Sequence, residues 1–506
     1  MATYFPVVII GSGFSGLCMA IRLKHAGCHD FVVLEKADEI GGTWRENTYP
    51  GCACDVPSHL YSLSFEPNPS WSRTFSGQPE IQEYLRHCTD KYGIRPHIHF
   101  GAEVVNARFD EAAAVWRLST STGAALTARV VVAGLGPLHV PNYPEISGIE
   151  RFRGTAFHSS RWDHNHKLRS RRVAVIGTGA SAVQFVPAIA PEVARLRLFQ
   201  RTPPWVMPKP DRTISRLEQQ LFRRAPLSQR LVRSALYWSF ESRLLGFSVC
   251  PRLLKSAEAL CRRHIARVVA DPELRAALTP GYTFGCKRVL LSNNYYPALV
   301  RPNVNLVTSP IREVREHCVV TADGAEHEVD TIIYGTGFRV GNASSPRIVG
   351  EDGVELAELW LRDGMQGHFG VAVSGFPNFF TLVGPNSGLG HNSLLFMIET
   401  QVGFVIRCLR MLDARRSQRI AVRSDAQRIF NQSLQRRMDR TVWQSGCQSW
   451  YLDEHGVNRT LWPRSTFAYW IRMRRPRIDE FDLVRRSNTT PILDHRSLNR
   501  SERYQR

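Results

Sequence analysis

The sequence has no uninterrupted apolar run close to the roughly 18 residues that a helix needs to span a bilayer. The nearest candidate, residues 231–250, contains Arg233, Glu241 and Arg243. We therefore expect an amphipathic helix that packs against the protein, with docking at a membrane surface as the alternative. The chain starts directly with an apolar strand and shows no basic leader or cleavage site, which predicts a cytoplasmic protein.

Runs of like charge are also missing, although the chain is basic. Lys and Arg total 65 against 45 Asp and Glu, which gives a formal charge of +20. A concentrated basic patch would favour a nucleic-acid partner. Because the arginines are instead scattered singly or in pairs, we expect no nucleic-acid partner and interpret the charge as favouring anionic cofactors.

A Cys-x-x-Cys pair is absent, although the chain has 11 cysteines. The closest two are Cys52 and Cys54, and their spacing does not fit a thiol redox centre. An odd number of cysteines without a leader peptide indicates a reducing compartment and no regular disulfide framework. We also predict no metal site.

With 506 residues, the chain is too long for one compact core, so two or three packed domains are expected. The first informative segment is an apolar strand followed by Gly11, Gly13 and Gly16 in the pattern Gly-x-Gly-x-x-Gly, and then by a helical pattern. In this context the glycines allow a tight turn and a close approach of the backbone to a pyrophosphate. A second apolar strand ends in Glu35, whose carboxylate can accept hydrogen bonds from ribose hydroxyls.

The same pattern returns at residues 171–190, where an apolar strand leads into Gly177, Gly179 and Ala182. Glu35 stands 24 positions after Gly11, and Arg201 stands 24 positions after Gly177. A carboxylate at this position would repel a 2′-phosphate, whereas a guanidinium would bind it. The first turn is therefore predicted to bind FAD and the second to bind NADPH.

These patterns predict an α/β fold with two Rossmann-like dinucleotide-binding domains. Strands that end in glycine-rich turns at residues 130–136 and 330–337 mark the two places where we expect the chain to cross between domains. We expect a discontinuous FAD domain at residues 1–150 and 330–506, with the NADP domain inserted at residues 151–329. Residues 211–280 are rich in Leu, Ala and Arg and predict a helical elaboration. The basic segment after Arg472 is expected to be partly disordered, and the sequence assigns it no role.

Two further segments resemble the type I Baeyer–Villiger monooxygenases. Residues 152–163, FRGTAFHSSRWD, are similar to the linker fingerprint of that family, and residues 41–55, GGTWRENTYPGCACD, are similar to its second fingerprint. The related flavin-containing monooxygenases usually lack the tryptophan, so Trp162 favours the Baeyer–Villiger branch. We interpret the linker as a joint between the domains, with His158 as a conformational element instead of a proton donor.

The resemblance implies conversion of a ketone to an ester or lactone, with NADPH and O₂, through a C4a-peroxyflavin. Residues 285–296, GCKRVLLSNNYY, are similar to the stretch that supplies the catalytic Arg, here Arg288. Arg288 would stabilise the negative charge of the reaction, and Asp55 would orient its guanidinium. Lys287 would bind the 2′-phosphate together with Arg201 and Thr202. The resemblance implies further cofactor contacts for Gly42, Thr43, Trp44, Tyr49, Asp55, Tyr61, Val104, Ser181 and Asn386.

The expected partners are a small organic substrate, either a ketone or a sulfide, and O₂; the sequence does not indicate an oligomeric state. Aromatic residues between 442 and 470 suggest an apolar pocket wall, including Trp443, Trp450, Tyr451 and Trp462. Three alternatives stay open: a monooxygenase acting on nitrogen or sulfur, a pyridine-nucleotide disulfide oxidoreductase, and a catalytically silent flavoprotein.

Overall fold

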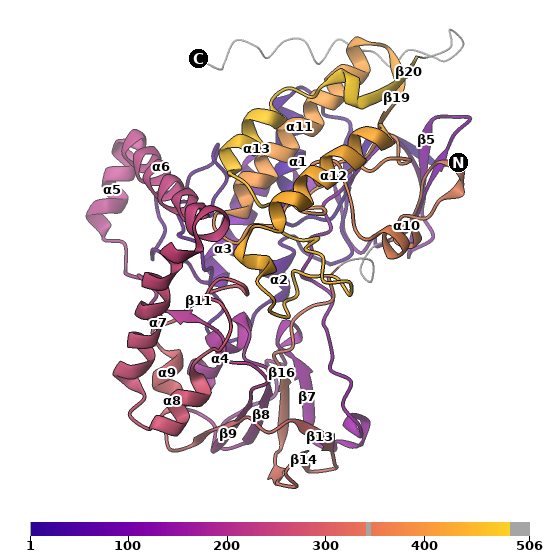
Figure 1. The fold of residues 1–506 in the computed structure, drawn as a ribbon. Helices are drawn as coiled ribbons and strands as arrows, with labels where there is room; N and C mark the ends of the chain where they lie inside the picture. Colours follow the sequence, from indigo (N-terminus) through magenta and orange to yellow (C-terminus); the bar gives the residue numbers. More distant parts are fainter. Residues whose placement is uncertain (1, 341–345, 486–506) are drawn as a thin grey trace.

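Two α/β halves, each built around a mainly parallel sheet, make up the computed structural model (Figure 1), which describes residues 2–340 and 346–485. The first sheet has eight strands in the order β17-β4-β5-β6-β1-β2-β3, and β18 also pairs with β6. Its strands are β1 (Thr3–Ile10), β2 (Phe31–Leu34), β3 (Ile98–His99), β4 (Val104–Asp110), β5 (Val115–Thr120), β6 (Ala125–Ala133), β17 (Arg347–Val349) and β18 (Phe379–Thr381).

The second sheet has five parallel strands in the order β12-β9-β8-β16-β7. They are β7 (Thr155–His158), β8 (Arg172–Ile176), β9 (Arg195–Phe199), β12 (Val304–Val307) and β16 (Thr331–Tyr334). The remaining strands form small antiparallel or two-stranded units: β10 (Val206–Met207) with β11 (Leu290–Leu291), β13 (Ile311–Val314) with β14 (Cys318–Thr321) and β15 (Glu326–Glu328), and β19 (Ser417–Val422) with β20 (Phe481–Arg485).

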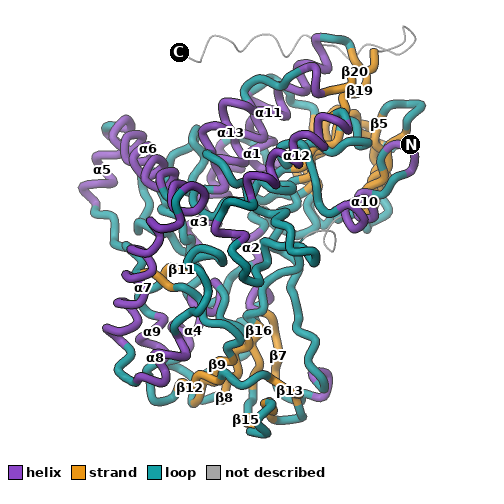
Figure 2. Tube along the Cα trace, in the orientation of Figure 1, coloured by secondary structure: helices purple, strands orange, loops and turns teal. Residues whose placement is uncertain are grey.

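Helices flank the sheets and form a separate block along one side (Figure 2). They are α1 (Phe14–His25), α2 (Thr43–Glu46), α3 (Gln78–Lys91), α4 (Ala180–Ile189), α5 (Arg216–Arg224), α6 (Pro226–Ser242), α7 (Leu254–Val268), α8 (Pro272–Leu278), α9 (Tyr295–Leu299), α10 (Leu356–Asp363), α11 (Leu394–Ala414), α12 (Ser424–Met438) and α13 (Thr466–Met473). The expected helical block at residues 211–280 corresponds to α5–α8. No helix among the described residues is both long and apolar enough to cross a bilayer.

Both central strands are buried because parallel sheets are covered on their two faces. Residues 7–10 of β1 and 173–176 of β8 are all buried. Helices α1 and α4 begin directly after Gly13 and Gly179, so each nucleotide turn joins a strand end to a helix start. One continuous hydrophobic cluster contains Val7 of the first sheet and Val173 of the second. The two halves are therefore packed together and share a core.

The position of β16 corrects one predicted boundary. We assigned residues from 330 onward to the first domain, but β16 pairs with β8 and β7 in the second sheet. The chain returns to the first sheet only at β17, which pairs with β4. The reason is a structural equivalence: β16 lies beside β8 as β6 lies beside β1. Each of these strands completes the sheet that the chain is about to leave.

Two other predicted segments also have a place in the fold. The segment after Arg472 is described up to residue 485, where β20 pairs antiparallel with β19; residues 486–506 lie outside the described part, so partial disorder of this segment stays a prediction. The linker also contributes a strand to the fold. Its residues Thr155–His158 form β7, the edge strand of the second sheet.

Candidate functional site

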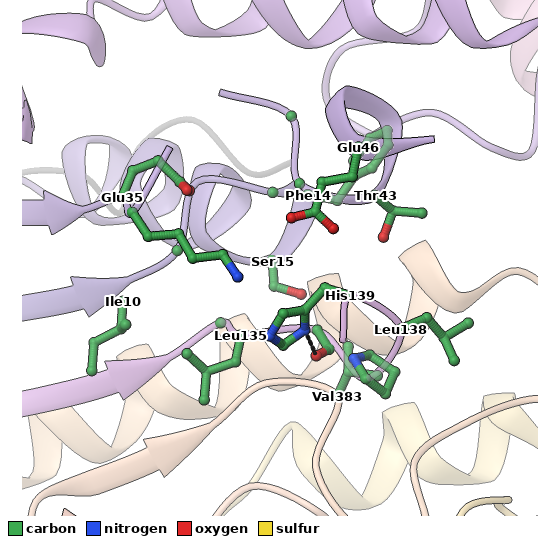
Figure 3. Close-up of a pocket in the computed structure, with 18 of the residues that line it drawn as sticks. Ile10, Phe14, Ser15, Glu35, Thr43, Glu46, Leu135, Leu138, His139 and Val383 are labelled. Carbon is green, nitrogen blue, oxygen red and sulfur yellow. Dashed lines mark hydrogen bonds between the residues drawn. The ribbon is translucent and has the colours of Figure 1, made fainter. Parts of the chain in front are cut away.

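A cavity of about 500 Å³ opens at the carboxyl end of β1 (Figure 3). Strand ends and turns of the first domain form most of its wall, and the start of α11 closes it with Leu394 and Leu395. The carboxyl ends of parallel strands are where such folds bind dinucleotides. Nine of the predicted cofactor residues line or adjoin this cavity: Gly11, Gly13, Glu35, Gly42, Thr43, Trp44, Tyr61 and Val104 line it, and Gly16 follows directly in α1.

Glu35 is held rigidly at the edge of this cavity. One carboxylate oxygen accepts hydrogen bonds from the backbone N–H and the hydroxyl of Ser12, both at 2.7 Å, and the other accepts from the N–H of Ala37 at 2.9 Å. The carboxylate thus lies beside the glycine turn at the end of β2, where a ribose would lie in this fold. This position fits the predicted role of Glu35 toward FAD.

The glycines of the two turns allow a close approach of backbone to backbone. A Cβ atom on Gly11, whose φ is +94°, would lie 2.8 Å from the carbonyl oxygen of Gly134. A Cβ atom on Gly177, whose φ is +104°, would lie 2.5 Å from the carbonyl oxygen of Gly335. Both positions therefore require glycine. The two turns have the same local design, and each leaves the N-terminus of a helix open to a phosphate.

Aromatic side chains form one wall of the cavity. The indole N–H of Trp44 donates to the hydroxyl of Tyr61 at 3.1 Å, and the ring of Phe14 packs edge-on against Tyr61. Tyr49 lies elsewhere: its hydroxyl donates to Gln184 of α4 at 2.9 Å. Gln184 also bonds the backbone of Ala53 in both directions. Tyr49 thus connects the fingerprint loop to the second nucleotide helix.

Arg288 and Asp55 meet at the contact between the two halves of the molecule. The Nε and Nη2 atoms of Arg288 donate to the same carboxylate oxygen of Asp55, at 2.9 and 2.5 Å. About a third of each side chain is exposed, so the guanidinium keeps donors free for another ligand. The nearby Asp55 carboxylate raises the pKa of Arg288 above its ordinary value. The site therefore holds a permanent, oriented positive charge.

Sequence reasoning placed Tyr451 only in a general pocket wall, whereas the structure places it beside Arg288. Its side chain is buried, and burial raises the pKa of its hydroxyl while the Arg288 charge opposes that rise. Trp443 stacks on Phe247 and Trp462 on Phe430, and both are buried. Trp450 is exposed. Of the four predicted aromatic residues, Tyr451 is thus the one next to the guanidinium.

A disulfide between Cys286 and Cys447 joins this loop to the C-terminal segment. The sequence predicted no regular disulfide framework, and this single bond was not anticipated. The partners are 161 residues apart, so their spacing along the chain gave no signal. The bond ties the segment that carries Arg288 to the segment that carries Tyr451. Cys52 and Cys54 are not bonded to each other, in line with their spacing, and both are buried; burial raises the pKa of Cys52 to about 11.

Arg201 and Lys287 come together at the second nucleotide turn. Burial and the positive charge of Arg201 lower the pKa of Lys287. Neither side chain has a carboxylate partner among the ion pairs of the described residues, which leaves two neighbouring cations uncompensated. Thr202 lies beside the turn, where its carbonyl accepts the hydroxyl of Thr178 at 3.1 Å. Such an arrangement is typical of an anion site.

The remaining predicted residues are distributed around this core. Gly179 and Ser181 lie at the start of α4. Asn386 is buried and its amide donates to the carbonyl oxygens of Asn458 and Leu461, at 2.8 and 3.1 Å, so it braces the C-terminal segment. His158 is buried in β7, where its Nδ1 accepts from the backbone N–H of Ser160; burial lowers the pKa of His158 to about 4.

Two residues were missed by the sequence analysis. Gln184 bridges the domains, and its only signal is that it is, besides Ser181, a polar residue on an otherwise apolar helix. Lys209 interacts electrostatically with Asp55, and burial lowers its pKa. No motif marks Lys209, since it reaches the site only through the fold.

Comparison with known proteins gives the class of this fold and site. The chain superimposes on cyclohexanone monooxygenase from Rhodococcus sp. Phi1 bound to NADP⁺ with a TM-score of 0.87 and 28% identity, covering 96% of this chain and 100% of the other. An ε-caprolactone-bound cyclohexanone monooxygenase matches with a TM-score of 0.84 and 28% identity, covering 95% of this chain and 100% of the other. The fold is that of the two-domain nucleotide-dependent monooxygenases.

The sequence relatives narrow the class to a family. A Baeyer–Villiger monooxygenase of Pseudomonas aeruginosa is 49% identical over 472 residues, which cover 92% of this chain and 89% of the relative. This chain belongs to the Baeyer–Villiger monooxygenases, as the resemblance predicted. The family described as pyridine nucleotide-disulphide oxidoreductase also matches residues 8–226, which contain both nucleotide turns. The cysteines of that region, Cys52 and Cys54 included, are not disulfide-bonded.

Proposed function

We propose that this protein is an FAD-containing, NADPH- and O₂-dependent monooxygenase that converts a ketone to an ester or lactone. The observation that carries the proposal is the Arg288–Asp55 pair at the contact between the two domains. Bound FAD, once reduced by NADPH, would supply the activation of O₂. The residues described here would bind the cofactors, keep them oriented and stabilise negative charge.

Arg288 would act on the charge that develops as oxygen is transferred. Ester formation from a ketone places negative charge on the former carbonyl oxygen, and a preorganised donor lowers the energy of that charge. Arg cannot lose its proton in the working pH range, so it cannot neutralise an anionic oxygen by protonating it. Asp55 would position the guanidinium, and Tyr451 beside it would form part of the substrate wall.

The choice of NADPH over NADH would depend on Arg201 and Lys287. Arg201 follows the end of β9, and Lys287 lies near it. Two neighbouring cations without a carboxylate partner fit the dianionic 2′-phosphate, which NADH lacks. The first site, with Glu35 at the same position, fits a ribose with a free 2′-hydroxyl, as in FAD.

The test replaces Arg288 with alanine and follows two steps separately. Purified holoenzyme is given NADPH, O₂ and a panel of cyclic, linear and aryl ketones together with a thioether. We expect Arg288→Ala to lose ester formation while NADPH still reduces the flavin. Arg362→Ala, which removes an exposed guanidinium paired with Asp363, is the matched control and should behave as wild type.

Two outcomes would contradict the proposal. Ester formation that survives in Arg288→Ala would show that another group stabilises the charge. Sulfoxide from the wild-type enzyme, without ester from any ketone, would assign the protein to the oxygenation of sulfur or nitrogen.

A further inference from the structure

The α5–α6 block carries a row of large apolar side chains that point into solvent. Five of them are more than half exposed, from 52% for Leu221 to 77% for Leu217. Monomeric proteins rarely leave such residues together on one surface without a use for them. The five are Leu217, Leu221, Leu227, Leu231 and Trp238, and we call this row the apolar row.

The row follows the helical period. On α6, Leu227, Leu231 and Trp238 are spaced by four and seven residues, which places them on one face of the helix. In Figure 1, α5 and α6 form the outer edge of the helical block, away from both sheets. The apolar row therefore lies on helices at this outer edge, and its three members on α6 share one face of that helix.

The opposite face of α6 is firmly anchored, so the exposure is not caused by a loosely attached helix. Gln229 donates to the carbonyl oxygen of Asn68 at 2.7 Å, and Arg233 donates to the carbonyl oxygen of His59 at 2.8 Å. Glu241 is buried and accepts from the backbone N–H of Thr466 at 2.7 Å. The helix thus has one satisfied polar and aromatic face and one face on which Leu227 and Leu231 are exposed.

The C-terminal helix α13 extends the same surface. The ring of Phe467 packs against Trp238, with 5.5 Å between the ring centroids. Ile471, one turn further along α13, is 54% exposed. Arg474 lies over the ring of Trp470 at the end of this helix. The surface therefore combines aromatic, aliphatic and cationic side chains from two segments far apart in sequence.

The charge around the apolar row has one sign. Every ionic side chain classed as exposed between residues 212 and 255 belongs to a cation: Arg212, Arg216, Arg223, Arg224, Arg230, Arg243, Arg252 and Lys255. The two carboxylates of this stretch, Glu218 and Glu241, are less exposed than these cations. Glu218 pairs with Arg212 and caps α5, and Glu241 is buried.

We propose that this surface docks onto the face of an anionic phospholipid bilayer. Leucine and tryptophan would enter the interface between headgroups and acyl chains, and the arginines would bind the anionic headgroups. A second copy of the chain is a poorer occupant, because a two-fold contact would set the cationic rows against each other. A nucleic acid would satisfy the arginines but leave the leucines in water.

The experiment measures co-sedimentation of the holoenzyme with lipid vesicles at low salt. We expect binding to vesicles of phosphatidylcholine mixed with phosphatidylglycerol, weak binding to phosphatidylcholine alone, and release as salt is raised. In the double variant Leu227→Ser/Leu231→Ser, the affinity for the mixed vesicles should fall by about tenfold or more. Leu361→Ser, which changes an equally exposed leucine on α10, is the matched control and should bind as wild type.

Charge reversal gives a second, independent variant. Arg224→Glu/Arg230→Glu should also weaken binding to the mixed vesicles. All variants should retain reduction of the flavin by NADPH, since none of these residues belongs to the nucleotide or Arg288 sites; this readout also shows that they fold.

Three results would overturn the proposal. The first is no sedimentation of the wild type with mixed vesicles, and the second is equal sedimentation of the wild type and the leucine double variant. The third is a wild-type dimer that the leucine double variant converts to monomers without any effect of lipid, which would make this surface a contact between copies. A failure of ester formation would not affect the proposal, because the assay measures binding alone.

Discussion

Replacing Asp55 with asparagine tests how far the orientation of Arg288 matters. The substitution keeps the shape of the side chain and one acceptor oxygen, but it removes the negative charge that both guanidinium nitrogens now contact, at 2.9 and 2.5 Å. Arg288 itself stays charged at any working pH. The variant therefore changes how firmly the cation is held and leaves its charge unchanged.

The size of the effect follows from the geometry and the exposure. A hydrogen bond to a charged group stabilises by about 1.5–3 kcal/mol when it is shielded from water. Here the side chains are 35% and 29% exposed, so we reduce the expected loss to about 1–2 kcal/mol. Because about 1.4 kcal/mol corresponds to a factor of ten in rate, ester formation should slow roughly 5- to 30-fold.

The assay separates the positioning of Arg288, which should affect ester formation, from the reduction of the flavin by NADPH. Stopped-flow absorbance follows reduction of the flavin by NADPH without O₂, and product analysis follows ester formation in air. We expect Asp55→Asn to slow the second and to leave the first within about twofold of wild type. Asp363→Asn removes the carboxylate of an exposed pair on α10 and should alter neither step. An unchanged rate of ester formation, or equal losses in both steps, would refute the positioning role.

Three further predictions concern the second nucleotide site, the disulfide and His158. Arg201→Gln should raise the KM for NADPH about tenfold or more while leaving the KM for NADH nearly unchanged, since only NADPH carries the 2′-phosphate; equal effects on both would contradict the assignment. Cys447→Ser should lower the free energy of unfolding by about 2–5 kcal/mol, measured with urea; a change below about 0.5 kcal/mol would show that the cross-link to Cys286 does not stabilise the fold. The pKa of His158 is about 4 in the folded protein and 6.5 ordinarily, so the unfolded state binds more protons between these two values. The free energy of unfolding should therefore fall as the pH drops through this range, by roughly 2 kcal/mol at pH 5. His158→Asn should make urea unfolding less sensitive to pH between 7 and 5.

The nucleotide sites could be predicted because their chemistry is local. A tight turn needs glycine at Gly11 and Gly177, and the residue 24 positions later is brought back to the turn by a short strand–helix–strand unit. The identity of that residue, Glu35 or Arg201, then decides which ribose it fits. A single sequence is enough to apply local rules of this kind.

The site around Arg288 could not be reached in that way. Arg288 and Asp55 are 233 residues apart, and only the resemblance to a family suggested that they meet. The Cys286–Cys447 bond, the Gln184 bridge and the position of Tyr451 depend on how the two domains pack, for which no motif exists. Strand β16 was placed in the wrong domain. An apolar strand followed by a glycine turn has the same sequence pattern whether it is the last strand of one domain or the first strand of the next.

The disulfide has a geometric consequence for any movement between the domains. The chain from Cys286 to Cys447 is closed into a covalent ring that runs through the second sheet, crosses to the first and returns along α11 and α12. If one domain rotates against the other, the two Cα atoms must stay close to their separation of 6.3 Å. The rotation axis therefore has to pass near this point. Arg288, two residues from the pivot, would be among the atoms displaced least, so nucleotide could be exchanged at the periphery while the guanidinium keeps its place.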